Sequence, residues 1–196
     1  MDLIQGWDLV GDIDPEIYRR ATIGIGCDNN AVWSGGRLRS YNGPEHRVGN
    51  YIADSTLNEI GISNVVDRLP DNEVVPFWHE VYRVSAHGAS VRLVGCYWTC
   101  VDVQADITRK RGLSEPMLAR LSVGGRATLR ADPLEDGVGL DVFEGIDLDP
   151  VQIVHVADPE WETRSSEAKA WHMAHGLNVV RRLNATLLVH KPCRIL

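Results

Sequence analysis

The sequence predicts a single-domain α/β protein with a largely parallel sheet, because strand patterns and helix patterns alternate along its 196 residues. No internal repeat or low-complexity linker divides the chain, so we expect one domain over residues 1–196. The composition is 44% hydrophobic and 24% charged, which is ordinary for a globular domain long enough to bury its own core.

Helices are expected where apolar residues recur at helical spacing or where a polar cap precedes them. The strongest pattern covers residues 71–84, with Asp71 or Asn72 as the cap and Gly88 as the stop after its end. Within this helix, Glu80 and Arg83 are predicted to pair on the surface because they lie three residues apart. The other expected helices are 15–20, 114–121 with Ser114 as its cap, and 165–177.

Strands are expected where β-branched and apolar residues form short runs or alternate with polar ones. Residues 31–50 are rich in Gly, Ser and Asn and are predicted to be mostly loop, whereas residues 127–142 are ambiguous. The expected strands are 7–10, 21–27, 57–62, 91–96, 151–156 and 186–190.

The formal net charge of −7 argues against binding nucleic acid by bulk electrostatics, which requires clustered lysines and arginines. The densest basic stretch, residues 109–111, is interpreted as a solvated turn. No apolar run approaches the length of a membrane span, and the first ten residues do not resemble a signal peptide. We therefore expect a cytoplasmic protein that does not bind membranes.

The cysteines and histidines give no clear metal signal. None of the cysteines forms a Cys-x-x-Cys pair, and the spacing of Cys96 and Cys100 alone defines no zinc site. His172 and His175 would share one face of a helix, but a metal ion would need a third ligand. We interpret them as surface or core histidines, and we expect reduced thiols.

A family resemblance lies within residues 54–95. Residues 54–60 read Asp-Ser-Thr-Leu-Asn-Glu-Ile, residues 64–71 read Asn-Val-Val-Asp-Arg-Leu-Pro-Asp, and residues 80–84 read Glu-Val-Tyr-Arg-Val ahead of Gly88. They resemble class I S-adenosylmethionine (SAM)-dependent methyltransferases. In that family an Asp-x-Ser-x-Asp-x-Ile strand precedes a His-Val-Leu-Glu-His-Leu-Pro-Asp loop and a helix ending Glu-x-Tyr-Arg-Val-Leu-Lys-Pro-Gly-Gly. Residues 106–111 more weakly resemble the Asp-Pro-Thr-His-Lys-Arg turn of a small bacterial and phage branch.

The resemblance implies a three-layer Rossmann-like sheet, mostly parallel, with an antiparallel C-terminal strand. It also implies a SAM site at the carboxyl ends of the first strands, with glycines after strand one and an acid after strand two. If residues 7–10 are strand one, Gly11 is the glycine that follows it and Asp28 is the acid that binds the ribose. The competing interpretation of Asp28 is a turn aspartate after a strand. This glycine loop is degenerate, because Asp12 and Asp14 stand where the SAM carboxylate would approach.

An alternative alignment uses residues 24–26 as the glycine loop. It leaves too few residues before Asp54 for the missing elements, so the first alignment is preferred. In both alignments residues 57–62 are strand four, and Ser63 and Asn64 follow that strand at the edge where ligands bind.

Three further positions follow from the resemblance. Asp54 is a candidate contact of the adenine, with a cap or turn aspartate as the competing interpretation. Tyr97 and Trp98 follow strand five, where the acceptor pocket of the family opens; packing in the core or a partner surface are the alternatives. The Glu-His pair of the family loop is Asp67-Arg68 here, so no role is carried over from that pair.

The resemblance implies a SAM-dependent methyltransferase-like protein that transfers a methyl group to an unknown acceptor. Such a transfer depends largely on positioning and does not require a dedicated base. The alternative is a catalytically inactive methyltransferase fold with a structural or assembly role, for example in a virus, which the degenerate glycine loop favours. A homo-oligomer is expected only from the general frequency of such assemblies.

Overall fold

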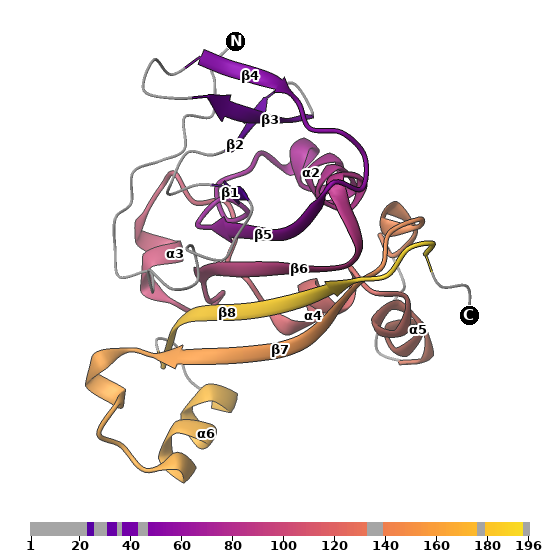
Figure 1. The fold of residues 1–196 in the computed structure, drawn as a ribbon. Helices are drawn as coiled ribbons and strands as arrows, with labels where there is room; N and C mark the ends of the chain where they lie inside the picture. The colour runs from indigo at the N-terminus through magenta and orange to yellow at the C-terminus, as the bar shows by residue number, and fades with distance from the viewer. Residues whose placement is uncertain are drawn as a thin grey trace.

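The computed structural model describes residues 23–25, 31–34, 37–42, 47–132, 139–175 and 179–193. The described strands form an eight-stranded sheet in the order β4-β3-β2-β1-β5-β6-β8-β7 (Figure 1). The strands are β1 (Ile23–Ile25), β2 (Ala31–Ser34), β3 (Arg37–Asn42), β4 (Arg47–Tyr51), β5 (Leu57–Ser63), β6 (Ser85–Cys96), β7 (Leu148–Ala157) and β8 (Val180–Val189). The helices are α2 (Asp71–Val84), α3 (Val101–Ala105), α4 (Glu115–Ala119), α5 (Val123–Ala131) and α6 (Ser166–His175), with short 3-10 helices η1 (Asp141–Phe143) and η2 (Pro159–Trp161).

The sheet is mixed. Strands β1, β5 and β6 run parallel to one another, as the α/β pattern predicts. Strand β8 runs antiparallel between β6 and β7, which confirms the expected antiparallel C-terminal strand. At the other end, β2, β3 and β4 form an antiparallel meander. The expectation of a mostly parallel sheet is therefore wrong.

The meander overturns the prediction that residues 31–50 are mostly loop. Residues 37–41 read Arg-Leu-Arg-Ser-Tyr, which alternates polar and apolar side chains as a strand does. The residues between β2 and β3 are Gly35 and Gly36, a typical pair for a two-residue hairpin connection. The alternation of polar and apolar residues predicts these strands, whereas the high content of Gly, Ser and Asn suggested a loop.

Strand β1 does not have the place that the preferred alignment gave it. It lies between β2 and β5, and in a doubly wound sheet the neighbour of strand four is strand one. The strand predicted over residues 21–27 is therefore strand one, and not strand two. Only residues 26–30 separate β1 from β2, which is too few for a helical crossover. The alternative alignment was rejected because it left too few residues before Asp54 for further helices and strands, and this objection no longer applies. Residues 7–20, which include Gly11, lie outside the described residues.

Helix α2 has the bounds that its apolar periodicity predicts, but the residues that cap its two ends are not the predicted ones. It buries Phe77, Trp78 and other apolar side chains, and its N-cap is Pro70, without a capping side chain. It ends where the backbone of Ser85 becomes extended, with a ψ of 140°, and the Ser85 hydroxyl donates a hydrogen bond of 2.6 Å to the Val81 carbonyl. Strand β6 begins at the same residue. Gly88, the predicted stop, lies inside β6 with a φ of +76°.

The elements predicted for the second half are present with the predicted type, and the structure adds the helices α3 and α5, which were not predicted. Ser114 caps α4 by accepting a hydrogen bond from the Met117 amide, as expected. Helix α6 replaces the expected helix over 165–177, and β7 extends the strand expected over 151–156. Strand β8 is much longer than residues 186–190, because its early polar residues point away from the core while Leu183, Ala185 and Leu187 face it.

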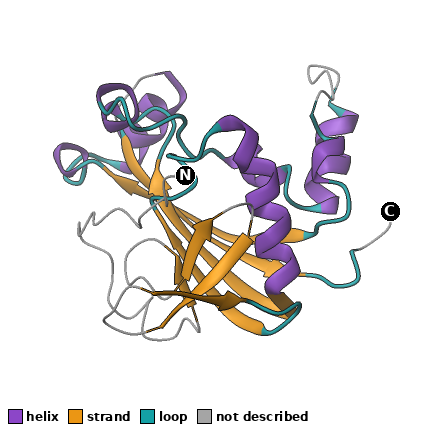
Figure 2. Ribbon diagram, turned by 90° about the horizontal axis from the view of Figure 1, so that it is seen from above, coloured by secondary structure: helices purple, strands orange, loops and turns teal. Residues whose placement is uncertain are grey.

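The core lies between one face of the sheet and the helices α2 and α4. In Figure 2 the long helix α2 lies along one side of the sheet. The opposite faces of β6, β7 and β8 carry polar or partly exposed side chains, such as Arg92, Gln152 and Thr186. Within the described ranges this gives two layers, and the third layer stays a prediction. No helix there is both long and apolar enough to cross a lipid bilayer.

Candidate functional site at the carboxyl ends of the parallel strands

The order of the strands defines where a ligand would meet the sheet. From β1 the chain continues outward through β2, β3 and β4, and from β5 it continues in the other direction through β6. The boundary between β1 and β5 is thus a topological switch point, and ligands of open α/β sheets bind outside the carboxyl ends of the strands at such a point. The residues that follow β1 and β5 therefore make up the candidate site.

Ser63 and Asn64 lie at this edge, as the sequence predicts. Ser63 is the last residue of β5, with 2% of its surface exposed. Asn64 has a left-handed φ of 50°, which asparagine tolerates better than most residues. Its side-chain amide donates to the Ser63 hydroxyl at 3.2 Å, and its backbone amide donates to the Val94 carbonyl at 2.8 Å. Asp28 follows β1 in the sequence but lies outside the described residues.

Asp54 lies at the other edge of the sheet. It precedes β5, which spans about 20 Å at 3.3 Å per residue, so Asp54 and Asn64 are at opposite ends of the strand. Its exposed carboxylate pairs with Arg83. The contact of Asp54 with the adenine stays a prediction, whereas the competing interpretation as a turn residue agrees with the turn in which Asp54 lies.

Glu80 and Arg83 form a partly buried clamp and not the predicted surface pair. Only 5% of Glu80 is exposed, and its carboxylate accepts hydrogen bonds from Arg83 Nε at 2.6 Å and from the Leu38 amide at 2.9 Å. Arg83 also donates to the Ile52 carbonyl at 2.7 Å. The hydrogen bonds that Arg83 donates to Glu80 raise the pKa of the Arg83 guanidinium. The clamp thus ties α2 to β3 and to the segment before β5.

The turn at residues 106–111 docks on the loop that follows β5, which overturns its interpretation as a solvated turn. Asp67 is buried and pairs with Arg109, while its carbonyl accepts from the Lys110 amide at 2.6 Å. Arg111 donates to the carbonyls of Val66 and Leu69 at 3.0 and 2.6 Å. The loop after β5 is held rigidly next to the candidate site by these contacts.

Asp106 is the hydrogen-bond acceptor at the start of this turn. Its carboxylate accepts from the Thr108 hydroxyl at 2.6 Å and from the Thr108 amide at 2.9 Å, and it pairs with Arg68 at 3.0 Å. Chiefly through the Thr108 side chain, these contacts lower the pKa of Asp106 to about 2. Because the pKa is lowered on folding, the resulting stability is present above the ordinary value of 3.8 and is lost as the pH falls through about 2.

The substitution Thr108→Val should raise the pKa of Asp106 part of the way back towards 3.8, because it removes the largest cause of the shift. The backbone bond and Arg68 remain, so the return is partial. The measurement is an NMR titration of the Asp106 carboxyl carbon in the two proteins. An unchanged pKa would show that the Thr108 hydroxyl does not bind the carboxylate.

Tyr97 and Trp98 lie beyond the carboxyl end of β6. Tyr97 is nearly buried and donates from its hydroxyl to the Glu115 carboxylate, 3.3 Å from Oε2. His155 Nε2 lies 2.5 Å from Glu115 Oε1, and its ring meets the Tyr97 ring edge-on at 5.3 Å. Trp98 is 54% exposed, with its ring 6.2 Å from that of Tyr97.

Glu115 and His155 were missed by sequence reasoning. They come from α4 and β7, far apart in the chain, and no motif spacing joins them to Tyr97. Together they form a carboxylate–imidazole pair of the kind that acts as a general acid or base. By contrast, His172 of the predicted histidine pair packs between the rings of Trp161 and Trp171, with centroids 4.5 and 4.7 Å away.

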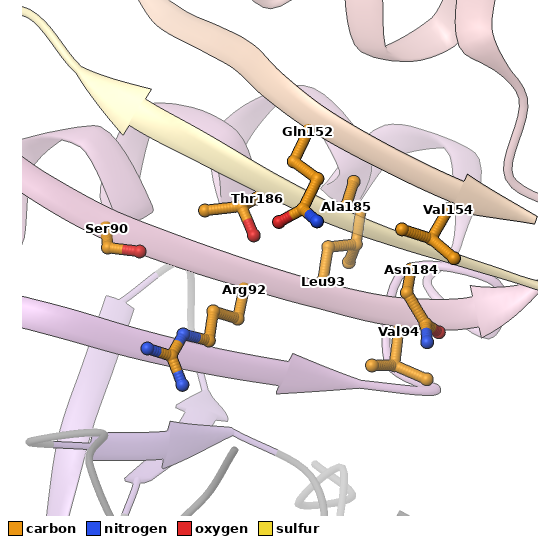
Figure 3. Close-up of a pocket in the computed structure, with 9 residues that line it drawn as sticks. All are labelled: Ser90, Arg92, Leu93, Val94, Gln152, Val154, Asn184, Ala185 and Thr186. Carbon is orange, nitrogen blue, oxygen red and sulfur yellow. The ribbon is translucent and has the colours of Figure 1, made fainter. Parts of the chain in front are cut away.

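A concavity of about 400 Å³ lies elsewhere, on the face of the sheet opposite the core (Figure 3). It contains none of the predicted site residues, although Val94 in its lining is the register partner of Ser63 at the end of β5. Its lining comes from the three C-terminal strands of the sheet, namely Ser90, Arg92, Leu93, Val94, Gln152, Val154, Asn184, Ala185 and Thr186.

No protein-family model and no curated protein sequence matches the chain. Similar solved structures include the N-methyltransferase NodS from Bradyrhizobium japonicum WM9, in complex with S-adenosyl-L-homocysteine. That protein is 10% identical, with 69% of this chain and 47% of that chain covered and a TM-score of 0.37. A SAM-dependent methyltransferase from Archaeoglobus fulgidus is 12% identical, with 70% and 61% covered and a TM-score of 0.39. Geranyl diphosphate C-methyltransferase from Streptomyces coelicolor A3(2) is 13% identical, with 74% and 53% covered and a TM-score of 0.42.

The described strands form a mixed α/β sheet, and membership of the class I methyltransferase family stays a prediction. The strand order around β1 and β5, the antiparallel β8 and the helix α2 agree with what the resemblance implies, whereas the antiparallel meander β2–β4 does not. The chain spans about half the length of the three proteins described above, from 47% to 61%. The small bacterial and phage branch stays a prediction.

Proposed function

We propose that this chain is a SAM-dependent methyltransferase whose cofactor binds outside the carboxyl ends of β1 and β5. The observation that supports the proposal is the parallel pairing of these two strands, with Ile25 opposite Ile62, at the switch point of the sheet. In a sheet of this order, the first βα turn and the turn after strand four face the same ligand.

The residues at this edge fit a nucleoside. Asn64 carries a carboxamide and Ser63 a hydroxyl, which are suitable partners for ribose hydroxyls and the adenine ring. After β1 the sequence continues Gly26-Cys27-Asp28, which supplies a small residue and an acid. The strand order favours Gly26 over Gly11 as the glycine next to the ligand. SAM itself supplies an electrophilic methyl group on its sulfonium.

The acceptor would bind beside Tyr97 and Trp98, at the carboxyl end of the neighbouring strand. Trp98 offers an exposed apolar ring, and the nearly buried ring of Tyr97 lies 6.2 Å from it. With the proton of His155 Nε2 donated to Glu115, His155 Nδ1 carries the lone pair that takes a proton from a nitrogen or oxygen acceptor. Glu115 holds the ring in that tautomer.

Calorimetry with SAM and S-adenosylhomocysteine tests the proposal. We expect binding, and we expect Asn64→Gly and Asp28→Ala each to weaken it by about 1–3 kcal/mol through lost hydrogen bonds. Glycine is the matched change at Asn64, because it tolerates the left-handed backbone. Asp54→Asn, at the other edge of the sheet, should leave the affinity unchanged.

The second candidate function is a catalytically inactive fold with a role in assembly. One observation favours it: residues 26–30 leave no room for a crossover helix, whose N-terminus would otherwise face the anionic end of the ligand. The absence of any heat with millimolar S-adenosylhomocysteine would contradict the first proposal and support this one. Light scattering of the same sample would test the predicted homo-oligomer.

A further inference from the structure

Two thiols and a carboxylate converge where β6 ends and α3 begins. Cys96 is the last residue of β6, Cys100 precedes α3, and Asp102 lies in its first turn. The cysteines are 3% and 2% exposed, whereas Asp102 is partly exposed. The two Sγ atoms and a carboxylate oxygen of Asp102 all lie within 4.8 Å of one another.

We propose that Cys96, Cys100 and Asp102 bind a zinc ion, with a water molecule as the fourth ligand. Zinc prefers tetrahedral sites of sulfur, nitrogen and oxygen ligands. Two sulfurs at 2.3 Å from a tetrahedral ion lie about 3.8 Å apart. Side-chain rotations that move the ligand atoms by about 1 Å therefore bring all three within bonding distance of the metal. The partly exposed side of Asp102 leaves a path for the ion and the water.

The charge of the surroundings suits this site. Two thiolates, one carboxylate and Zn²⁺ carry a net charge of −1. Arg181 Nε lies 3.7 Å from Asp102, so a guanidinium group borders the anionic complex. Cysteine binds zinc as the thiolate, so each thiol loses its proton when the metal binds. Binding then forms two Zn–S bonds and releases two protons to solvent.

The ion would fix the turn that carries Trp98. This turn joins Cys96 to Cys100, and Trp98 donates from its backbone amide to the Leu113 carbonyl at 3.0 Å. A metal that binds both ends of the turn restricts it in the same way as a disulfide would. The inference does not rest on SAM binding, because the three ligands lie in residues 96–102, between the end of β6 and the first turn of α3.

Titration of the reduced full-length protein with Co²⁺, followed by displacement with Zn²⁺, tests the site. We expect one equivalent of cobalt to give thiolate charge-transfer absorption and the visible bands of a tetrahedral ion. Asp102→Asn should weaken cobalt binding about tenfold or more, and Cys100→Ser should abolish the charge-transfer band. Asp102 is partly exposed, so its variant keeps the fold even if a cysteine variant does not.

Cys193 provides the matched control. It lies apart from the cluster, where its thiol donates to the Ile146 carbonyl at 3.4 Å, so Cys193→Ser should leave the cobalt spectrum unchanged. The proposal is overturned if no thiolate–cobalt band develops, or if Asp102→Asn binds cobalt like the parent. It is also overturned if mass spectrometry shows that Cys96 and Cys100 form a disulfide in the presence of one equivalent of zinc and glutathione.

Discussion

Replacing Glu80 by alanine should lower the free energy of unfolding by about 3 kcal/mol. The change removes the acceptor of Arg83 and of the Leu38 amide, and it leaves a guanidinium that is only 21% exposed without its main partner. Arg83 keeps its exposed partner Asp54, so the cost falls at the lower end of that for a broken buried pair. Urea denaturation followed by circular dichroism measures it.

Two further variants of α2 make this result specific. Asn72→Ala, at an exposed position of the same helix, should change stability by less than about 0.5 kcal/mol. Glu80→Gln keeps an acceptor for the Leu38 amide but loses the charge. Its cost in unfolding free energy should therefore lie between those of Asn72→Ala and Glu80→Ala. A cost below about 1 kcal/mol for Glu80→Ala would mean that the clamp does not hold α2 to β3.

Asp67→Ala should also cost about 3 kcal/mol, because it leaves Arg109 buried without its nearest carboxylate. Asp106 stays 3.3 Å from Arg109 Nε and limits the loss. The double variant Asp67→Ala/Arg109→Met should be less destabilised than the sum of the single variants, since removing both charges leaves neither uncompensated. Chemical denaturation of the four proteins gives the coupling energy.

The Asp67→Ala substitution should also affect the candidate ligand site at the carboxyl end of β5. The docked turn holds the loop after β5, so the same Asp67→Ala variant should bind S-adenosylhomocysteine more weakly than the parent. Lys110→Ala, whose side chain is exposed, is the control, because the docking contact of that residue is made by its backbone amide. Additive single-variant costs in the double variant would contradict a direct Asp67–Arg109 pair.

The sequence predicts those elements whose side chains carry a clear period. Helix α2 has its predicted bounds because its apolar residues recur on one face, and the ends of β5 and β6 follow from their apolar runs. The meander β2–β4 was missed because glycine and polar residues dominate its composition, although the alternation around Leu38 was present. The place of β1 in the sheet depends on pairing with β5, which no local pattern contains.

Some residues of the candidate site could be predicted from the sequence and others could not. The positions of Ser63, Asn64, Tyr97 and Trp98 were predictable because each lies at or within two residues of the end of a strand, and the ends of neighbouring parallel strands meet at one edge. Glu115 and His155 reach Tyr97 only through the packing of α4 and β7. The family resemblance supplied Asp54 from its position before a strand, and the structure separates it from the edge where a ligand would bind. Sequence order therefore predicts strand ends better than contacts between elements.

A SAM-type ligand is proposed to bind at the carboxyl ends of β1 and β5. Titration of the ¹⁵N-labelled protein with S-adenosylhomocysteine, followed by NMR amide shifts, tests this binding site. We expect saturable shifts that centre on Gly26, Ser63 and Asn64, with Asp54 at the opposite edge unaffected. No shifts at millimolar ligand, or shifts centred on the concavity formed by β6, β7 and β8, would contradict the proposal.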